Sequence, residues 1–183
     1  MESKDQNKLE VHRGLLLVLA QSHLGSKLRR KLDPEDLVQE AMQRGHKHFE
    51  TFEGRDDPER TKAWLLAIMK NVLTDVLKHF AADKRELAKE QSAALDLNQS
   101  ALGVEAFLAA DQTSPSMAVA RNEEMQKLAR GLQNLPDDAR NIVVMKHLQN
   151  MTLQQIADAT GKTVPAVAGL LRRGLARLRE YLD

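Results

Sequence analysis

Residues 153–174 read "LQQIADATGKTVPAVAGLLRRG" and have the pattern of two short helices joined by a tight glycine turn. Ala157 is small where the second helix would cross the first, Gly161 follows in the turn, and Val167 is an apolar residue that can lock the two helices together. The stretch therefore predicts a helix-turn-helix, with a generic helical hairpin as the alternative. The remaining inward positions are also apolar: Ile156, Val164 and Leu170.

The second helix of this motif offers few side chains that can read bases. Its first outward positions are small or lack a side-chain donor, and Arg172 follows one turn later. Residues 161–179 contain five basic side chains and no acidic one, which suits contact with phosphates. We expect binding to duplex DNA mainly through backbone charge, with modest base readout. The candidate contacts are Lys162, Thr163, Pro165, Ala168, Gly169, Arg172, Arg173 and Arg177, and Arg179 extends the same basic strip.

The composition narrows the class of protein. The 183 residues include 27 basic and 26 acidic side chains, so the net charge favours no particular partner. Cysteine is absent, which excludes disulfides and thiolate metal sites. The longest apolar run, "GLLLVLA", is far shorter than the roughly 20 residues that a membrane span needs. We therefore expect a cytoplasmic protein with no membrane segment.

Apolar residues recur at three- and four-residue spacing along most of the chain, and alternating strand-like runs are absent. This pattern predicts an all-α fold with helices at 7–30, 34–49, 58–80, 115–134, 137–149, 153–160 and 164–181. Residues that can cap helices support several of these starts: Asp33, Ser114, Thr152 and Thr163. Residues 82–114 have no sustained apolar face. We expect two small helical domains, residues 1–81 and 115–183, joined by a linker at 82–114.

The range 58–80 predicts the most informative helix of the first domain. Its expected buried stripe comprises Leu66, Ile68, Met69, Leu73, Val76, Leu77 and Phe80. Trp64 and Asn71 lie together on the other side and are flanked by the cations Lys70 and Lys78. An aromatic surface beside amide and ammonium groups suits single-stranded nucleic acid, because bases stack and phosphates pair with cations. The alternative is that Trp64 packs against the preceding helix.

That preceding helix, at 34–49, is amphipathic. Its buried edge is expected to hold Leu37, Ala41, His48 and Phe49. Its polar face, which is suited to a partner protein, holds Asp36, Gln39, Glu40, Gln43 and Lys47. The sequence "FEGRDD" at 52–57 predicts a short loop between the two helices.

Together these stretches resemble a known family. "DPEDLVQEAMQRGHKHFETFEGR" (33–55) and "AWLLAIMKNVLTDVL" (63–77) resemble the second conserved region of bacterial extracytoplasmic-function sigma factors, which belong to the sigma-70 family. "LQNLPDDARNIVVMKHLQNMTLQQIADATGKTVPAVAGLLRRGLARLREYL" (132–182) resembles their fourth region. The two stretches occur in the family's order with a linker between them. The resemblance implies a region 2-like domain followed by a region 4-like domain.

The resemblance implies binding to core RNA polymerase and to promoter DNA. By position, the candidate polymerase-binding residues are Asp36, Gln39, Glu40, Gln43 and Lys47. The family opens the promoter at its −10 element and holds one strand, and the matching residues are Phe52, Glu53, Gly54, Arg55, Trp64, Lys70 and Asn71. The last helix corresponds to the reader of the −35 duplex. Family members often carry basic residues where this chain has Ala168 and Leu170, which agrees with modest base readout.

Other classes of protein fit the sequence less well. It has no cysteine nucleophile, phosphate-binding glycine loop or zinc-binding His-Glu-x-x-His helix, so we expect no catalysis, cofactor or metal. His46 and His48 are two residues apart and would point away from each other on a helix. The main alternative is an operator-binding helix-turn-helix regulator with an N-terminal dimerisation domain, and a protein-only adaptor is a third. A sigma factor would be a monomer when free, and an anti-sigma factor would be a further partner.

Overall fold

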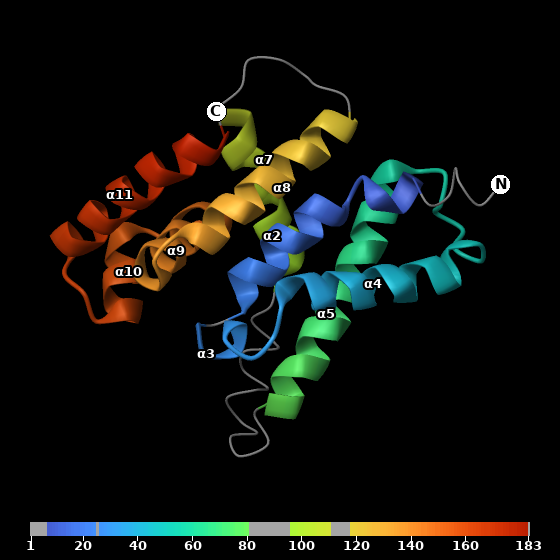
Figure 1. Ribbon diagram of the computed structural model, residues 1–183, viewed down its shortest axis with the longest axis horizontal. Helices are drawn as coiled ribbons and strands as arrows, with labels where there is room; N and C mark the ends of the chain where they lie inside the picture. The colour runs from blue at the N-terminus through green and yellow to red at the C-terminus, as the bar shows by residue number, and fades with distance from the viewer. Residues whose placement is uncertain (1–6, 25, 81–95, 111–117, 183) are drawn as a thin grey trace. The chain divides into compact units, whose positions relative to one another are not determined.

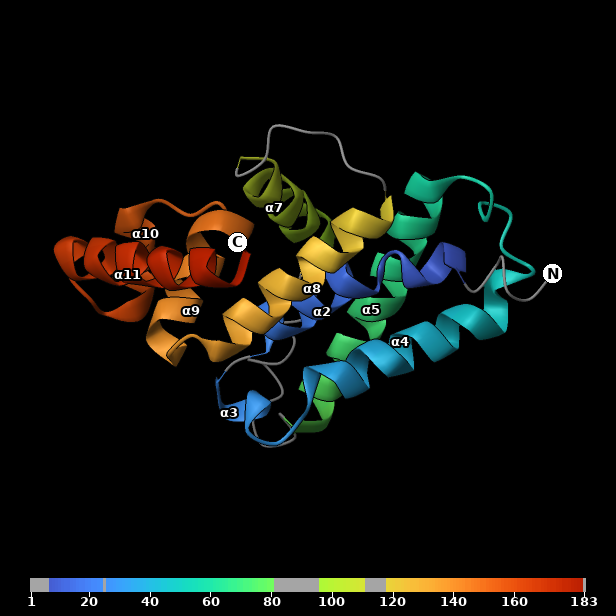
Figure 2. The same cartoon turned by 45° about the horizontal axis from the view of Figure 1, so that its top comes forward.

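The computed structural model of the protein describes residues 7–24, 26–80, 96–110 and 118–182. Within these ranges every regular element is helical and no strand occurs, so the expected all-α fold is confirmed. Figures 1 and 2 show the helices coloured in chain order, from blue at the N-terminus to red at the C-terminus. The chain divides into two compact units, residues 1–98 and 99–183.

The first unit is built on helices α2 (Arg13–His23), α4 (Pro34–Phe49) and α5 (Pro58–Phe80), with the single turn α3 (Ser26–Arg29) between α2 and α4. The three long helices pack on one another, and α4 crosses α5 in both Figure 1 and Figure 2. The most buried side chains on α4 and α5 are at most 1% exposed and include Val38, Leu65, Met69 and Leu73. Burying an apolar side chain of this kind contributes roughly 1.5–3 kcal/mol. The shared core therefore fixes how α4 and α5 present their outer faces.

Local signals set the start of α4. Asp33 accepts a hydrogen bond from the main-chain N–H of Glu35 at 2.9 Å, and Pro34 occupies the first helical position.

Further upstream, the prediction of a single helix at 7–30 is wrong. Residues 7–10 are helical, a turn follows at 11–12, and α2 ends before Leu24, whose backbone is extended. Apolar spacing did not reveal these breaks because no proline marks either of them.

Two side chains that the sequence pattern predicted to be buried are exposed in the structure. His48 is exposed on α4, and Phe80 at the end of α5 is 42% exposed. Leu65 and Val72 are buried instead, because α5 packs against both α2 and α4 and so buries a broader face. The apolar stripe of α5 is therefore wider and rotated relative to the one that its spacing predicted.

The second unit contains the helix-turn-helix. Helices α10 (Leu153–Thr160) and α11 (Val164–Leu182) form the motif, supported by α8 (Ala118–Asn134), α9 (Asp137–Val143) and the π-helical turn η1 (Val144–Leu148). Three of the predicted core positions, Ile156, Ala157 and Val167, are confirmed as buried, and they form a cluster with Ile142 that is 0–4% exposed. The predicted Val164 and Leu170 are partly buried and pack against this cluster. Gly161 ends α10 with a φ of +66°, a left-handed conformation that glycine adopts without strain.

A further helix, α7 (Leu97–Ala110), lies inside the range that the sequence predicted as linker. Its Gly103 lies against η1 so closely that a Cβ atom there would be 2.6 Å from the carbonyl oxygen of His147. The Phe107 ring also meets the His147 ring edge-on, with centroids 5.1 Å apart. Helix α7 thus packs on the second unit. The expected cap at Ser114 lies outside the described residues, and α8 begins at Ala118.

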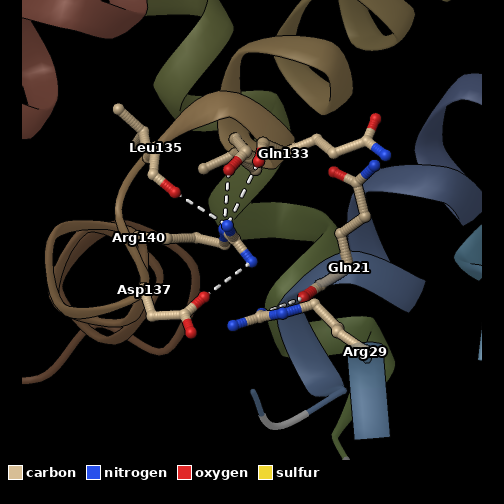
Figure 3. A network of polar contacts seen from close by, with 7 residues as sticks. Gln21, Arg29, Gln133, Leu135, Asp137 and Arg140 are labelled. Carbon is tan, nitrogen blue, oxygen red and sulfur yellow. Dashed lines mark hydrogen bonds and ion pairs between the residues drawn. The ribbon is translucent and has the colours of Figure 1, made fainter. Parts of the chain in front are cut away.

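A buried arginine fixes the corner between α8 and α9 (Figure 3). Arg140 is 7% exposed, and its guanidinium donates to the carbonyl oxygens of Leu132 at 2.6 Å, Gln133 at 3.1 Å and Leu135 at 2.7 Å. It also pairs with Asp137 at 3.3 Å. Burial lowers the pKa of Arg140, but four partners keep the group satisfied. In the first unit, Figure 3 shows Arg29 donating to the carbonyl oxygen of Gln21 at 2.9 Å.

No helix in the described ranges is long and apolar enough to cross a membrane. The same ranges contain no group of three or more histidine or acidic side chains that could hold a metal ion.

Candidate nucleic-acid interface

Helix α4 presents a continuous polar face on the first unit. The residues expected to bind the polymerase are all exposed: Asp36, Gln39, Glu40, Gln43 and Lys47. The opposite face is buried through Leu37, Val38 and Ala41, so the amphipathic pattern of the sequence is confirmed there.

Arg44 supports this polar face, and no sequence motif pointed to it. Its guanidinium bonds Glu40 at 2.8 Å on the same helix and Asp75 of α5 at 3.3 Å. The hydrogen bond to Glu40 is the largest contribution that raises the pKa of Arg44. Arg44 therefore links Glu40 on α4 to Asp75 on α5.

The loop at 52–55 is folded around an aromatic stack. The ring of Phe52 lies parallel to the indole of Trp64, with centroids 4.5 Å apart and planes 8° apart. Gly54 is buried beside this ring, and a Cβ atom at Gly54 would lie 2.4 Å from the tip of Phe52. Arg55 bonds the carbonyl oxygen of Glu50 at 2.8 Å, which ties the loop to the end of α4. The loop is therefore held in a defined conformation, in which the side chains of Glu53 and Arg55 are exposed.

Trp64 is half-buried rather than fully open to solvent. Phe52 covers one face of its indole, and Phe49 at the end of α4 lies 6.1 Å away, centroid to centroid. This agrees with the alternative that Trp64 packs against the preceding helix. The covered face is not open to a base, so any stacking on Trp64 must use the rest of the ring.

The polar face of α5 continues from Trp64 toward the end of the helix. Lys70, Asn71 and Lys78 are exposed on it. Asp57 caps the start of α5 by accepting from the main-chain N–H groups of Glu59 at 2.9 Å and Arg60 at 3.2 Å. An amide and two ammonium groups at this spacing can bond bases and phosphates of one strand.

A second ion pair supports the loop from the N-terminal segment. Lys8 bonds Asp56 at 2.8 Å, and this bond lowers the pKa of the Asp56 carboxyl. No sequence pattern indicates such a pairing, because the two residues are 48 positions apart.

The helix-turn-helix is set by local hydrogen bonds. Thr152 accepts from the N–H of Gln155 at 3.2 Å, and the Gln155 side chain accepts from the N–H of Thr152 at 2.8 Å, which is the predicted capping box. Thr163 accepts from the N–H of Ala166 at 3.4 Å at the start of α11. Both predicted caps are confirmed, and Thr163 and Pro165 are exposed beside the turn.

Charges around α11 lie mostly as the sequence predicted. The four arginines of the strip are exposed: Arg172, Arg173, Arg177 and Arg179. Gly169 has open space beside it, since the nearest atom to a Cβ there would be a guanidinium nitrogen of Arg173 at 3.5 Å. Lys162, in contrast, is paired with Asp138 at 3.0 Å, so a phosphate would have to compete for it. Leu170 packs against the buried cluster.

A helix-turn-helix with a basic second helix, in a chain whose other helical unit has exposed polar faces, defines a DNA-binding protein. Comparison with family models agrees. Residues 9–83 match sigma-70 region 2, and residues 125–178 match sigma-70 region 4. The two matches cover more than two thirds of the chain.

Curated relatives are sigma factors of the same kind. The ECF RNA polymerase sigma factor SigX of Bacillus subtilis is 26% identical over 157 residues, which is 84% of this chain and 72% of the relative. The RNA polymerase sigma factor CnrH of Cupriavidus metallidurans is 28% identical over 82% of this chain and 74% of the relative. The RNA polymerase sigma-E factor of Streptomyces coelicolor is 27% identical over 82% and 72%.

The chain therefore belongs to the sigma-70 family, in its extracytoplasmic-function group. It is an RNA polymerase sigma factor that directs transcription initiation, and it is not an enzyme. Its partners are core RNA polymerase and promoter DNA.

Proposed function

We propose that the two units divide the work of promoter recognition between them. The first unit binds the polymerase through the exposed face of α4 and binds the −10 element through the 52–55 loop and α5. The second unit binds the −35 duplex through α10 and α11. The observation that carries this proposal is the match between exposed polar groups and the family's contact positions: the α4 face, Asn71 on α5 and the arginine strip of α11 are all exposed.

At the −10 element the proposed event is capture of an extruded base. Extruding a base costs a few kcal/mol, which a site that binds the base offsets. The ordered loop around Phe52 and Gly54 supplies the wall of such a site, and Lys70 and Asn71 hold the strand beside it. Recognition and opening of the strand then become one step.

At the −35 element binding is mainly electrostatic. Arg173 and Arg177 contact phosphates, while Pro165, Ala168 and Gly169 let the backbone approach the groove. Such binding weakens steeply with salt, because each neutralised phosphate releases counterions. Arg172 is the residue that we assign to base contact.

Each unit alone has a small DNA surface, so the polymerase supplies the affinity by holding both units at the promoter. We propose that the free protein is a cytoplasmic monomer and that an anti-sigma factor holds it inactive by covering these exposed faces.

Fluorescence polarisation on promoter and scrambled DNA, with and without core polymerase, tests the proposal. We expect promoter-specific binding only with core polymerase, and we expect Arg172→Ala to weaken it about fivefold, the equivalent of roughly 1 kcal/mol. Arg121→Ala, an exposed arginine on α8, is the matched control and should bind normally. Tight, promoter-specific binding by the free protein would contradict the proposal.

A further inference from the structure

A cavity of the second unit has no role in the proposed function. Its volume is about 430 Å³, and its lining residues come from α7, η1, α11 and the residues after η1. All of them belong to the second unit, and they include Phe107 of α7, Lys146 and His147 of η1, Asn150, and Leu175 and Arg179 of α11. Cavities of about 300–1,000 Å³ are typical of small-molecule sites.

Part of the cavity lining is apolar. The Phe107 ring meets the His147 ring edge-on at 5.1 Å, and Leu175 of α11 adds an aliphatic side chain. Burial, and to a smaller extent the charge of Lys146, lowers the pKa of His147, so its imidazole is neutral at pH 7. The two rings and the leucine therefore offer a surface suited to an uncharged, apolar group.

Two cations line the same cavity, and none of its described lining residues is acidic. Lys146 is half-buried and donates one hydrogen bond, to the carbonyl oxygen of Met151 at 3.3 Å, so two of its three N–H groups have no printed acceptor. Arg179 is exposed at the end of the arginine strip, after the arginines to which the proposed function assigns DNA contacts. Within the described ranges neither cation pairs with a carboxylate. This combination favours an anion in the cavity.

The backbone is irregular where it borders the cavity. The N–H of Gln149 bonds the carbonyl oxygen of Val144, five residues back, at 3.1 Å. Asn150 follows with a φ of +53°, and no other non-glycine residue of the described chain has a positive φ. Wide helical turns and left-handed residues other than glycine are both frequent at functional sites. Here they border the segment from which Lys146 and the exposed Asn150 amide reach the cavity.

The charged and apolar parts of the lining together indicate the chemistry of a ligand. A guanidinium such as that of Arg179 binds a carboxylate through two parallel hydrogen bonds, and the Lys146 ammonium can add a third. Inorganic phosphate would leave Phe107 and Leu175 without a contact, and so would a phosphate of DNA. An uncharged apolar molecule would leave both cations unpaired. A molecule with one carboxylate and an apolar body satisfies both parts.

We infer that the cavity lined by α7, η1 and α11 is a binding site for a small carboxylate with an apolar body, either aliphatic or aromatic. Lys146 and Arg179 bind the carboxylate, and Phe107 and Leu175 contact the apolar body. Because the bound molecule touches all three elements, it stabilises the packing of α7 on the second unit. The inference does not depend on how the two units bind the promoter.

The test is an NMR titration of the full-length, ¹⁵N-labelled protein with two carboxylates, naphthalene-1-acetate and decanoate. Naphthalene-1-acetamide, which has the same ring system without the charge, and inorganic phosphate, which has the charge without an apolar body, are the matched controls. We expect at least one carboxylate to shift the amide resonances of α7, η1 and the second half of α11, and to slow hydrogen exchange in α7. The two controls should bind at least about tenfold more weakly. The tighter carboxylate shows whether the body is aromatic or aliphatic.

Variants assign the binding to the two cations. Lys146→Gln and Arg179→Gln should each weaken binding of the tighter carboxylate about tenfold, because each removes a charge-assisted hydrogen bond. Lys146→Arg keeps the charge and should bind within about threefold of the wild type. Arg177→Gln removes an exposed charge from the same helix outside the cavity lining, and its affinity for the carboxylate should be unchanged. The amide spectrum of each variant reports whether it is folded, and the exposed position of Arg179 keeps the test available if Lys146→Gln does not fold.

Three outcomes would overturn the inference. In the first, neither carboxylate shifts the resonances of α7 and η1 at millimolar concentration. In the second, the acetamide binds as tightly as the acetate, so that the cations do not contribute. In the third, Arg177→Gln weakens binding as much as Arg179→Gln does, which would indicate a general attraction of anions to α11. If the carboxylates do not bind but Lys146→Gln and Arg179→Gln weaken promoter binding by the holoenzyme, the two cations belong to the DNA interface, and the proposed function still stands.

Discussion

Phe52, Gly54 and Trp64 show how one position without a side chain can organise a loop. The Phe52 ring stacks on Trp64 only because nothing projects from Gly54 into the space that the ring occupies. Stacked aromatic pairs contribute about 0.5–1.5 kcal/mol beyond the area that they bury. The loop that we assign to the −10 element thus depends on a residue that makes no polar contact with DNA through a side chain.

Gly54→Ala should disturb this stack. The new Cβ atom would lie 2.4 Å from one Phe52 ring atom, 2.8 Å from another and 3.0 Å from the Cβ of Arg60, so the ring must move away from Trp64. We expect the free energy of unfolding to fall by about 1–3 kcal/mol, as for other overpacked sites. Trp64 is the only tryptophan in the sequence, so its fluorescence spectrum reports the change directly.

Gly169→Ala is the control for Gly54→Ala. The space beside Gly169 is open except for the exposed side chain of Arg173 at 3.5 Å, so alanine should fit and leave the Trp64 spectrum unchanged. An unaltered spectrum and unaltered stability in Gly54→Ala would show that the loop does not depend on the stack.

The interactions that could be predicted from the sequence are those between residues that lie close together in the chain. The caps at Asp33, Thr152 and Thr163 and the turn at Gly161 act within a few positions, so local spacing is enough to identify them. Pairs such as Lys8–Asp56 could not be predicted, since tertiary packing brings them together. The candidate site residues follow the same division: the exposure of the α4 face followed from periodicity, whereas the burial of Gly54 and the cover on Trp64 did not.

Helix α7 is the element that the sequence pattern missed. It contains many small and apolar residues and a single charge, Glu105, so no polar face contrasts with an apolar one. Its partner, η1, is also unusual: the N–H of Gln149 bonds the carbonyl oxygen of Val144, five residues back. Wide turns of this kind interrupt regular helices and are frequent at functional sites. Here the carbonyl oxygen of His147 lies where Gly103 can approach it closely.

Gly103→Ala should separate α7 from η1. A Cβ atom there would lie 2.6 Å from the His147 carbonyl oxygen and 2.7 Å from the Cα of Leu148, and main-chain atoms cannot move aside as a side-chain tip can. We expect faster hydrogen exchange throughout α7. The lowered pKa of His147, which arises first from burial and then from Lys146, should rise toward its ordinary value in an NMR titration.

Leu102→Ala is the control on α7. Leu102 is 60% exposed, so its loss should alter neither hydrogen exchange in α7 nor the pKa of His147. If Gly103→Ala behaves in the same way, α7 does not depend on this close approach.

In the proposed function, the division of the chain into two units means that variants in different units affect different steps of initiation. The residues assigned to the −10 strand belong to one unit, and those assigned to the −35 duplex belong to the other. Because the two sets belong to different units, we expect changes in one to add to changes in the other as free energies. Periodicity and turn signals were enough to predict two helical domains, but whether α7 belongs to a unit or to the linker depends on packing that they do not describe.

Asn71→Ala and Arg172→Ala should therefore act on different steps of initiation. Closed-complex affinity, measured in the cold, should fall about fivefold with Arg172→Ala and stay unchanged with Asn71→Ala, because Asn71 is assigned to the opened strand. Strand opening, followed by 2-aminopurine fluorescence in the −10 element, should be reduced about fivefold by Asn71→Ala alone, since one hydrogen bond is worth about 1 kcal/mol. In the double variant the two losses should multiply to within about twofold. A closed complex that Asn71→Ala weakens as much as Arg172→Ala does would mean that both units read duplex DNA, and strand capture by α5 would have to be abandoned.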